Sequence, residues 1–146
     1  MKTFFIVLTV LAGCVLPFQG AINGRLGKSI GSPVFASLIS FLIGTIALLL
    51  YGIITQSSFR LQSIKQVPAF EWTGGILGAF YVLVVVLMLP RLGAALAFSL
   101  IVAGQMAVSM WLDHAGILVS VQHPINIWRV LGLCLIISGV IIVRRF

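Results

Sequence analysis

Long, almost uncharged runs of apolar residues fill most of this sequence, and each run is long enough to cross a lipid bilayer. A bilayer core about 30 Å thick needs about 20 mainly apolar residues in helical form. In lipid only helices and closed barrels satisfy their backbone groups, and these runs lack the alternation with period two that barrel strands show. We therefore predict an all-α integral membrane bundle, a single domain over residues 1–146, with five transmembrane helices at residues 3–24, 33–55, 72–90, 92–112 and 125–143.

Composition supports this class and leaves little chain for any other part. Hydrophobic residues make up 61% of the 146 residues and charged residues only 8%, which is far from a soluble domain. The net charge of +7 is spread over the loops and both ends. That distribution fits anchoring to anionic membrane lipid and not a basic stripe along nucleic acid. We expect membrane lipid as a partner and no nucleic acid.

The few ionisable side chains form no recognisable catalytic or metal site. The chain has two carboxylates, Glu71 and Asp113, and both lie at the edges of predicted spans. Asp113 precedes His114, but neighbouring residues at a helix end do not converge on one point, and one pair supplies too few metal ligands. We predict no enzyme activity, no metal and no cofactor. Glu71 and Asp113 are candidates for coupling transport to protons from the membrane rim.

Uncharged polar side chains inside the spans are the candidates for function. At that depth such side chains usually face the bundle interior, where they bond another helix or line a cavity. Gln19 and Asn23 are four residues apart and share one helical face. For these two and for Gln105, substrate contact and helix-to-helix bonding are both open, and serines can also bond their own helix. The candidates for the substrate path are Gln19, Asn23, Ser40, Tyr81, Ser99 and Gln105.

Small residues recur along the spans at helical spacing. Such stripes let two helix backbones approach closely within a membrane. The predicted helix-packing positions are Gly44, Gly74, Gly78, Gly132 and Gly139.

The basic residues indicate no preferred orientation in the membrane. Threading five spans places four Lys and Arg on one side and five on the other, too small a bias for the positive-inside rule. Two oppositely inserted copies would form an inverted pair like those of many transporters. We therefore expect dual topology and an antiparallel homodimer. The first side holds Lys2, Arg60, Lys65 and Arg129. The second side holds Arg25, Lys28, Arg91, Arg144 and Arg145.

A series of short motifs resembles one known family along essentially the whole chain. The motifs are Phe18–Gly27, Gly31–Pro33, Ser40–Thr45, Gly74–Tyr81, Pro90–Ala95, Gly104–Gln105, Asp113–Gly116, Arg129–Gly132 and Ser138–Gly139. They resemble the YdcZ-type family of small bacterial inner-membrane proteins, within the drug/metabolite transporter superfamily. The resemblance implies a multi-pass exporter in the inner membrane. It also implies a five-helix half-transporter that pairs, often in opposed orientations.

The resemblance does not extend to the mechanism of the related four-span multidrug exporters. Those proteins carry a glutamate in their first helix, where this chain has Cys14, Pro17 and Gln19. We predict a small-molecule exporter that works as a homodimer, with a cavity lined by the first four spans. Two alternatives stay open: a small-ion channel formed by an antiparallel dimer, and a non-transporting membrane subunit whose polar residues only hold helices together.

Overall fold

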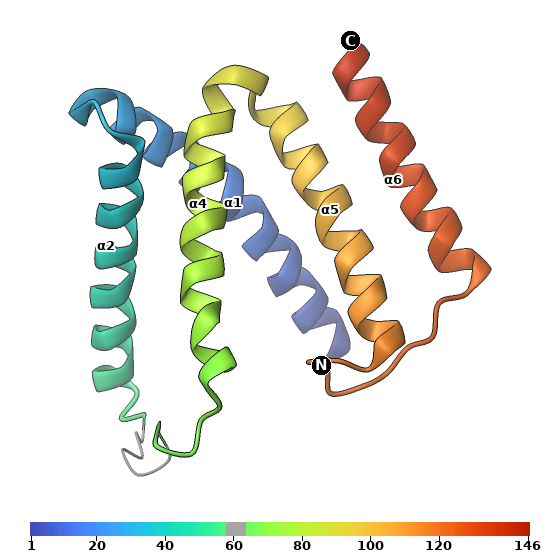
Figure 1. Cartoon of the computed structure of the whole chain (residues 1–146), viewed down its shortest axis with the longest axis horizontal. Coiled ribbons are helices and arrows are strands. Elements are labelled where there is room, and N and C mark those ends of the chain that lie inside the picture. The colour runs from blue at the N-terminus through green and yellow to red at the C-terminus, as the bar shows by residue number, and fades with distance from the viewer. Residues whose placement is uncertain (58–63) are drawn as a thin grey trace. The chain divides into compact units, whose positions relative to one another are not determined.

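The structure, a computed structural model, describes residues 1–57 and 64–146, and most of these residues are helical (Figure 1). Five helical segments are long and apolar enough to cross a membrane, and the described residues contain no strand. The predicted all-α class with five spans is confirmed. The segments are α1 (Lys2–Ile30), α2 (Pro33–Ile54), η1 (Ala69–Trp72) continued by α4 (Thr73–Leu92), α5 (Ala94–Ala115) and α6 (Ile127–Arg145). Arg60, counted above for orientation, lies outside the described residues.

The chain forms two compact units, which are described separately. Unit 1 covers Met1–Arg91 and contains α1, α2 and α4, and unit 2 covers Leu92–Phe146 and contains α5 and α6. The grouping of all five spans into a single domain stays a prediction.

Helix α1 continues past Gly24, the predicted end of the first span, and reaches Ile30. Pro17 lies inside it, and because proline has no N–H, the carbonyl of Gly13 loses its usual helical donor. The helix ends where Gly31 takes a left-handed conformation, with φ 71°, a common stop for helices. The first span is therefore longer than predicted.

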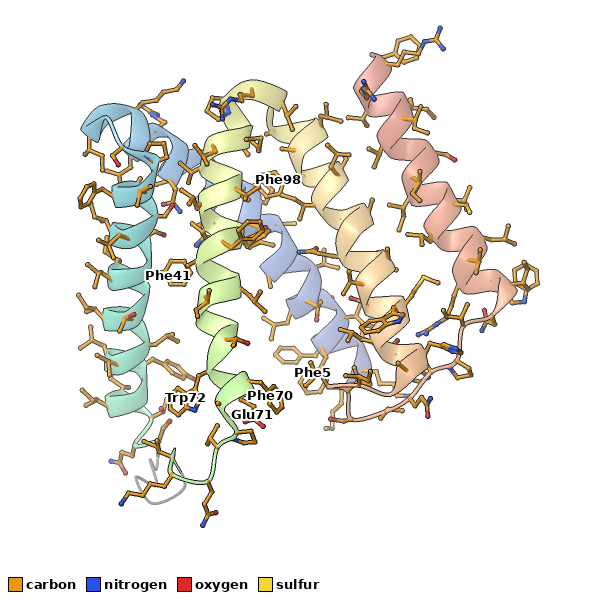
Figure 2. All side chains as sticks on the ribbon, in the orientation of Figure 1. Phe5, Phe41, Phe70, Glu71, Trp72 and Phe98 are labelled. Atoms are coloured by element: carbon orange, nitrogen blue, oxygen red, sulfur yellow. The ribbon has the colours of Figure 1, made fainter. Side chains whose placement is uncertain are left out.

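Small residues bring the three helices of unit 1 together. A Cβ built on Gly27 of α1 would lie 3.4 Å from Val86 Cγ1 of α4 and 3.6 Å from Ala36 Cβ of α2. A Cβ on Gly78 of α4 would lie 3.4 Å from Phe41 Cζ of α2, and Figure 2 shows Phe41 between these two helices. Close contact at Gly27 and Gly78 therefore positions α1, α2 and α4 around the polar residues described below.

Unit 2 is a hairpin in which α5 packs against α6. Ala97 and Met110 of α5 and Val140 of α6 are buried. After α5, Gly116 takes a left-handed conformation, with φ 66°, and the chain then folds back over the end of that helix. A Cβ on Gly116 would lie 3.3 Å from Gln122 Cδ, so the connecting loop is packed onto the helix end.

Candidate functional site

Four of the six predicted substrate-path residues come together in unit 1. Asn23 Nδ2 donates a hydrogen bond to Ser40 Oγ over 3.0 Å, which joins α1 to α2. Gln19 and Asn23 of α1 and Tyr81 of α4 line one small cavity. We call Gln19, Asn23, Ser40 and Tyr81 the polar cluster. It gathers uncharged polar side chains from three membrane-spanning helices.

Helical spacing explains why α1 contributes two members of the polar cluster. Residues four apart lie on one face of a helix, so Gln19 and Asn23 both face the same cavity. Gly20 lies on this face too and is buried. The remaining lining of the cavity is apolar and consists of Leu16, Val82 and Val85.

Burial makes the hydrogen bonds of the polar cluster matter for stability. Asn23 is only 6% exposed, and a buried amide without a partner costs about 1–3 kcal/mol. Its bond to Ser40 removes part of that cost. Tyr81 Oη is buried and has no hydrogen-bond partner among the described residues.

The cavity beside the polar cluster is small. Its volume is about 10 Å³, which is near the lower limit for holding a single water molecule. Any solute larger than water therefore requires α1, α2 and α4 to move apart. The polar cluster is packed closed in this structure.

The other two substrate-path candidates, Ser99 and Gln105, lie on α5 in unit 2. Ser99 Oγ donates to Ala95 O of its own helix over 2.7 Å, as proposed for serines in general. Ser99 also lines an apolar groove of about 430 Å³ between α5 and α6. Gln105 is exposed. These two residues therefore belong to a different unit from the polar cluster.

The two carboxylates have different surroundings. Glu71 lies in η1 and is exposed, at the start of the third span (Figure 2). Asp113 lies in the last turn of α5 and forms an ion pair with Arg129 in the first turn of α6. From the sequence, Asp113 was considered as a candidate for proton coupling, and Arg129 was not identified as its partner. The opposite charges at the facing ends of two consecutive spans were the available signal.

Of the predicted packing glycines, Gly78 makes a close contact, with Phe41. Among the described residues, and apart from the backbone of the same helix and the chain neighbours, no atom lies within 4 Å of a Cβ built on Gly44, Gly74, Gly132 or Gly139. Their role in helix packing stays a prediction. Gly27, which sequence reasoning did not select, is the glycine at which three helices of unit 1 meet.

Comparison with known proteins decides the family. The model of the family described as "Putative inner membrane exporter, YdcZ" matches residues 4–142. The chain belongs to the YdcZ family. The resemblance noted from the motifs is thus confirmed, and so is the location: five candidate spans fit a multi-pass protein of the inner membrane. A YdcZ protein is a membrane exporter, a transporter rather than an enzyme. Neither the curated proteins nor the solved structures include a match to this chain.

Nothing in the described parts of this YdcZ protein resembles a metal centre. Across residues 1–57 and 64–146, no three His, Cys, Asp or Glu side chains lie close enough together to hold an ion. The polar cluster is thus the candidate functional site, and its chemistry is hydrogen bonding without charge.

Proposed function

We propose that this protein exports a small molecule, and that Gln19, Asn23, Ser40 and Tyr81 contact the substrate as it crosses the membrane. The observation that carries the proposal is the polar cluster itself, with its Asn23–Ser40 bond between two spans. Polar residues at membrane depth are costly and commonly mark a transport path. The cluster offers hydrogen-bond donors and acceptors and no charge, so it suits an uncharged polar group of the substrate.

Transport through the polar cluster requires an opening step. The present cavity of about 10 Å³ admits no molecule larger than water. Separating α1 from α2 breaks the bond between Asn23 and Ser40 and exposes both side chains. Pro17 lies in α1 less than two turns before Asn23, and proline weakens a helix at such a point. We propose that α1 moves about Pro17 when the path opens.

We also propose that the working unit is an antiparallel homodimer, with an aqueous cavity lined by the first four spans of each copy. Two opposed copies have the in-plane two-fold symmetry on which alternating access is commonly built. The near-equal distribution of Lys and Arg, four against five, supports insertion in both orientations.

The test is flux in proteoliposomes, measured over a broad panel of labelled metabolites. Gln19→Leu and Asn23→Leu each raise apolarity, so the protein should still insert. Each should lower flux of the transported compound about two- to tenfold, the effect of losing one hydrogen bond of about 0.5–1.5 kcal/mol. Thr45→Val is the control, because Thr45 lies in α2 and bonds only Phe41 O of its own helix. Wild-type flux in both variants would remove Gln19 and Asn23 from the path.

The same assay separates the three function classes. Saturable flux with counter-transport supports an exporter. Flux far above about 10³ per second per site, beyond common turnover, indicates a channel. Absence of flux for every solute, with loss of assembly in the two variants, indicates a subunit in which the polar cluster only joins helices.

A further inference from the structure

We propose that the cavity beside Tyr81 binds one ordered water molecule, held by the Tyr81 hydroxyl and the side-chain amides of Gln19 and Asn23. This proposal concerns the resting protein and holds whether or not the polar cluster lies on the transport path.

The first observation is the hydroxyl of Tyr81. Its oxygen is buried and has no hydrogen-bond partner among the described residues. Tyr81 lies near the middle of the span Ala69–Leu92, at a depth where the bilayer provides no bulk water. Buried polar atoms in folded proteins nearly always have a protein or water partner. A partner for Tyr81 Oη is therefore expected.

The second observation is the size of the cavity. A bound water needs a cavity volume of about 10–15 Å³, and this cavity has a volume of about 10 Å³. The cavity is therefore near the lower limit for one water molecule and has no room for a second. The apolar side chains of Leu16, Val82 and Val85 line the rest of the cavity, so they limit where a water can be bonded.

The third observation is the set of free donors and acceptors around that space. A buried water typically makes two to four hydrogen bonds. One Nδ2 hydrogen of Asn23 is committed to Ser40, which leaves its amide oxygen as an acceptor. Gln19 also lines the cavity, and its side-chain amide can both donate and accept a hydrogen bond. With the Tyr81 hydroxyl, three side chains can bond the same water.

The bound water would connect α1 to α4, as the Asn23–Ser40 bond connects α1 to α2. Helix α1 would then be tied to both of its neighbours in unit 1 by polar contacts at similar depth. Opening of unit 1 would require both contacts to break.

The sign of a stability change tests the proposal. Tyr81→Phe removes one oxygen and keeps the ring. If the hydroxyl is unpaired, its removal relieves a desolvation penalty and raises the midpoint of thermal unfolding, Tm. If the hydroxyl bonds a water, its removal leaves the water short of a partner and lowers Tm by a few degrees. The matched control is Tyr51→Phe, because Tyr51 is the other of the two tyrosines and is 65% exposed, so its hydroxyl should affect Tm little.

We expect Tyr81→Phe to lower Tm in detergent relative to Tyr51→Phe, and a raised or unchanged Tm overturns the proposal. A second variant tests whether the water bridges α1 and α4. The effects of Tyr81→Phe and Gln19→Leu on Tm should be less than additive, since either substitution disrupts the same water, and full additivity contradicts the proposal.

If Tyr81→Phe does not fold, an experimental structure of the wild-type protein tests the proposal instead. An experimental structure at about 2 Å resolution should show a density peak about 2.5–3.0 Å from Tyr81 Oη and within hydrogen-bond reach of Gln19 or Asn23. A dry cavity, or a direct bond from Gln19 to Tyr81, overturns it.

Discussion

Arg129 Nη2 lies 2.8 Å from Asp113 Oδ2, so an ion pair joins the first turn of α6 to the last turn of α5. The same guanidinium donates through Nη1 to His123 O over 3.0 Å, and His123 N donates to Asp113 O over 3.0 Å. The last carbonyls of a helix have no donors within it. Here the loop supplies them, so Arg129 holds the loop as a cap on α5.

Removing this ion pair should destabilise unit 2 modestly. The two side chains are 31% and 26% exposed, so Arg129→Gln should cost about 1 kcal/mol, near the upper end for partly exposed pairs. Asp113→Asn should cost less, because the bond from Arg129 to His123 O remains. Unfolding in detergent measures both. Arg144→Gln, in the last turn of the same helix, is the control, and an equal loss there would show that the pair contributes nothing.

The bond between Asn23 and Ser40 should appear as an energetic coupling between α1 and α2. In a double-mutant cycle of Asn23→Ala and Ser40→Ala, the stability changes should differ from additivity by about 0.5–1.5 kcal/mol. Ser37→Ala provides the comparison, because Ser37 lies on α2 as Ser40 does and is buried, but it donates to Pro33 O of its own helix. Coupling of Asn23 to Ser37 as large as that to Ser40 would contradict the bond.

Helix α1 ends at Gly31 because of the backbone conformation of this residue, and not because a side chain there would lack room. In the part of the chain that the structure describes, and apart from the backbone of the same helix and the chain neighbours, no atom lies within 4 Å of a Cβ built on Gly31 or on Gly24. Of these two glycines, Gly31 alone has a positive φ, of 71°. Gly31→Ala should therefore destabilise by about 1 kcal/mol, and Gly31→Asn by less. Gly24→Ala, inside the helix, should stabilise by up to about 1 kcal/mol. Similar Tm values for the two alanine variants would refute this account.

The spans were predictable because their cause is local. A continuous apolar run has one way to satisfy its backbone in lipid, so the number and type of elements follow from the sequence. Helix α2 begins at Pro33 as predicted, since Ser32 Oγ accepts from Phe35 N and proline at the first position lacks only an unused donor. The predicted end of the first span at Gly24 was wrong, because helix α1 continues to Ile30 and ends at the left-handed Gly31.

All four members of the polar cluster were among the predicted substrate-path candidates, but only the grouping of Gln19 with Asn23 was predictable from the sequence. The shared face of Gln19 and Asn23 follows from their spacing of four. Their partners on α2 and α4 depend on how each helix is rotated about its axis. A helix that is apolar all round has no polar face from which that rotation can be deduced. The contact of Gly27 with α2 and α4 was missed for the same reason.

Proton coupling through a carboxylate should be dispensable. The chain has two carboxylates, Glu71 and Asp113, neither lies in the middle of a span, and that of Asp113 is bonded to Arg129. We expect the double variant Glu71→Gln, Asp113→Asn to transport without a proton gradient. Arg129→Gln controls for loss of the ion pair itself. Wild-type flux that strictly needs a gradient, is lost in the double variant and survives in Arg129→Gln would show that a rim carboxylate carries protons.

The antiparallel homodimer makes a prediction about orientation. Five spans would place the two ends of the chain on opposite faces of the membrane, and the tally of four against five Lys and Arg provides no clear orientation signal. Three lysines added after Phe146 should place nearly all copies in one orientation, because added C-terminal charges can set a topology. Three added serines are the matched control for the extension and should change nothing. Reporter fusions or cysteine labelling from either side measure the orientation.

If two opposed copies form the transport path, the lysine-tagged protein alone should lose most of its flux. A variant with the three lysines at the N-terminus instead is biased in the opposite sense and should also be impaired alone. Co-expression of the two variants restores one copy in each orientation, and flux should recover. The two-fold axis in the membrane plane is then regained, and with it the symmetry that alternating access requires. Full flux from a population shown to have one orientation would rule out the opposed pair and favour a parallel dimer or a monomer.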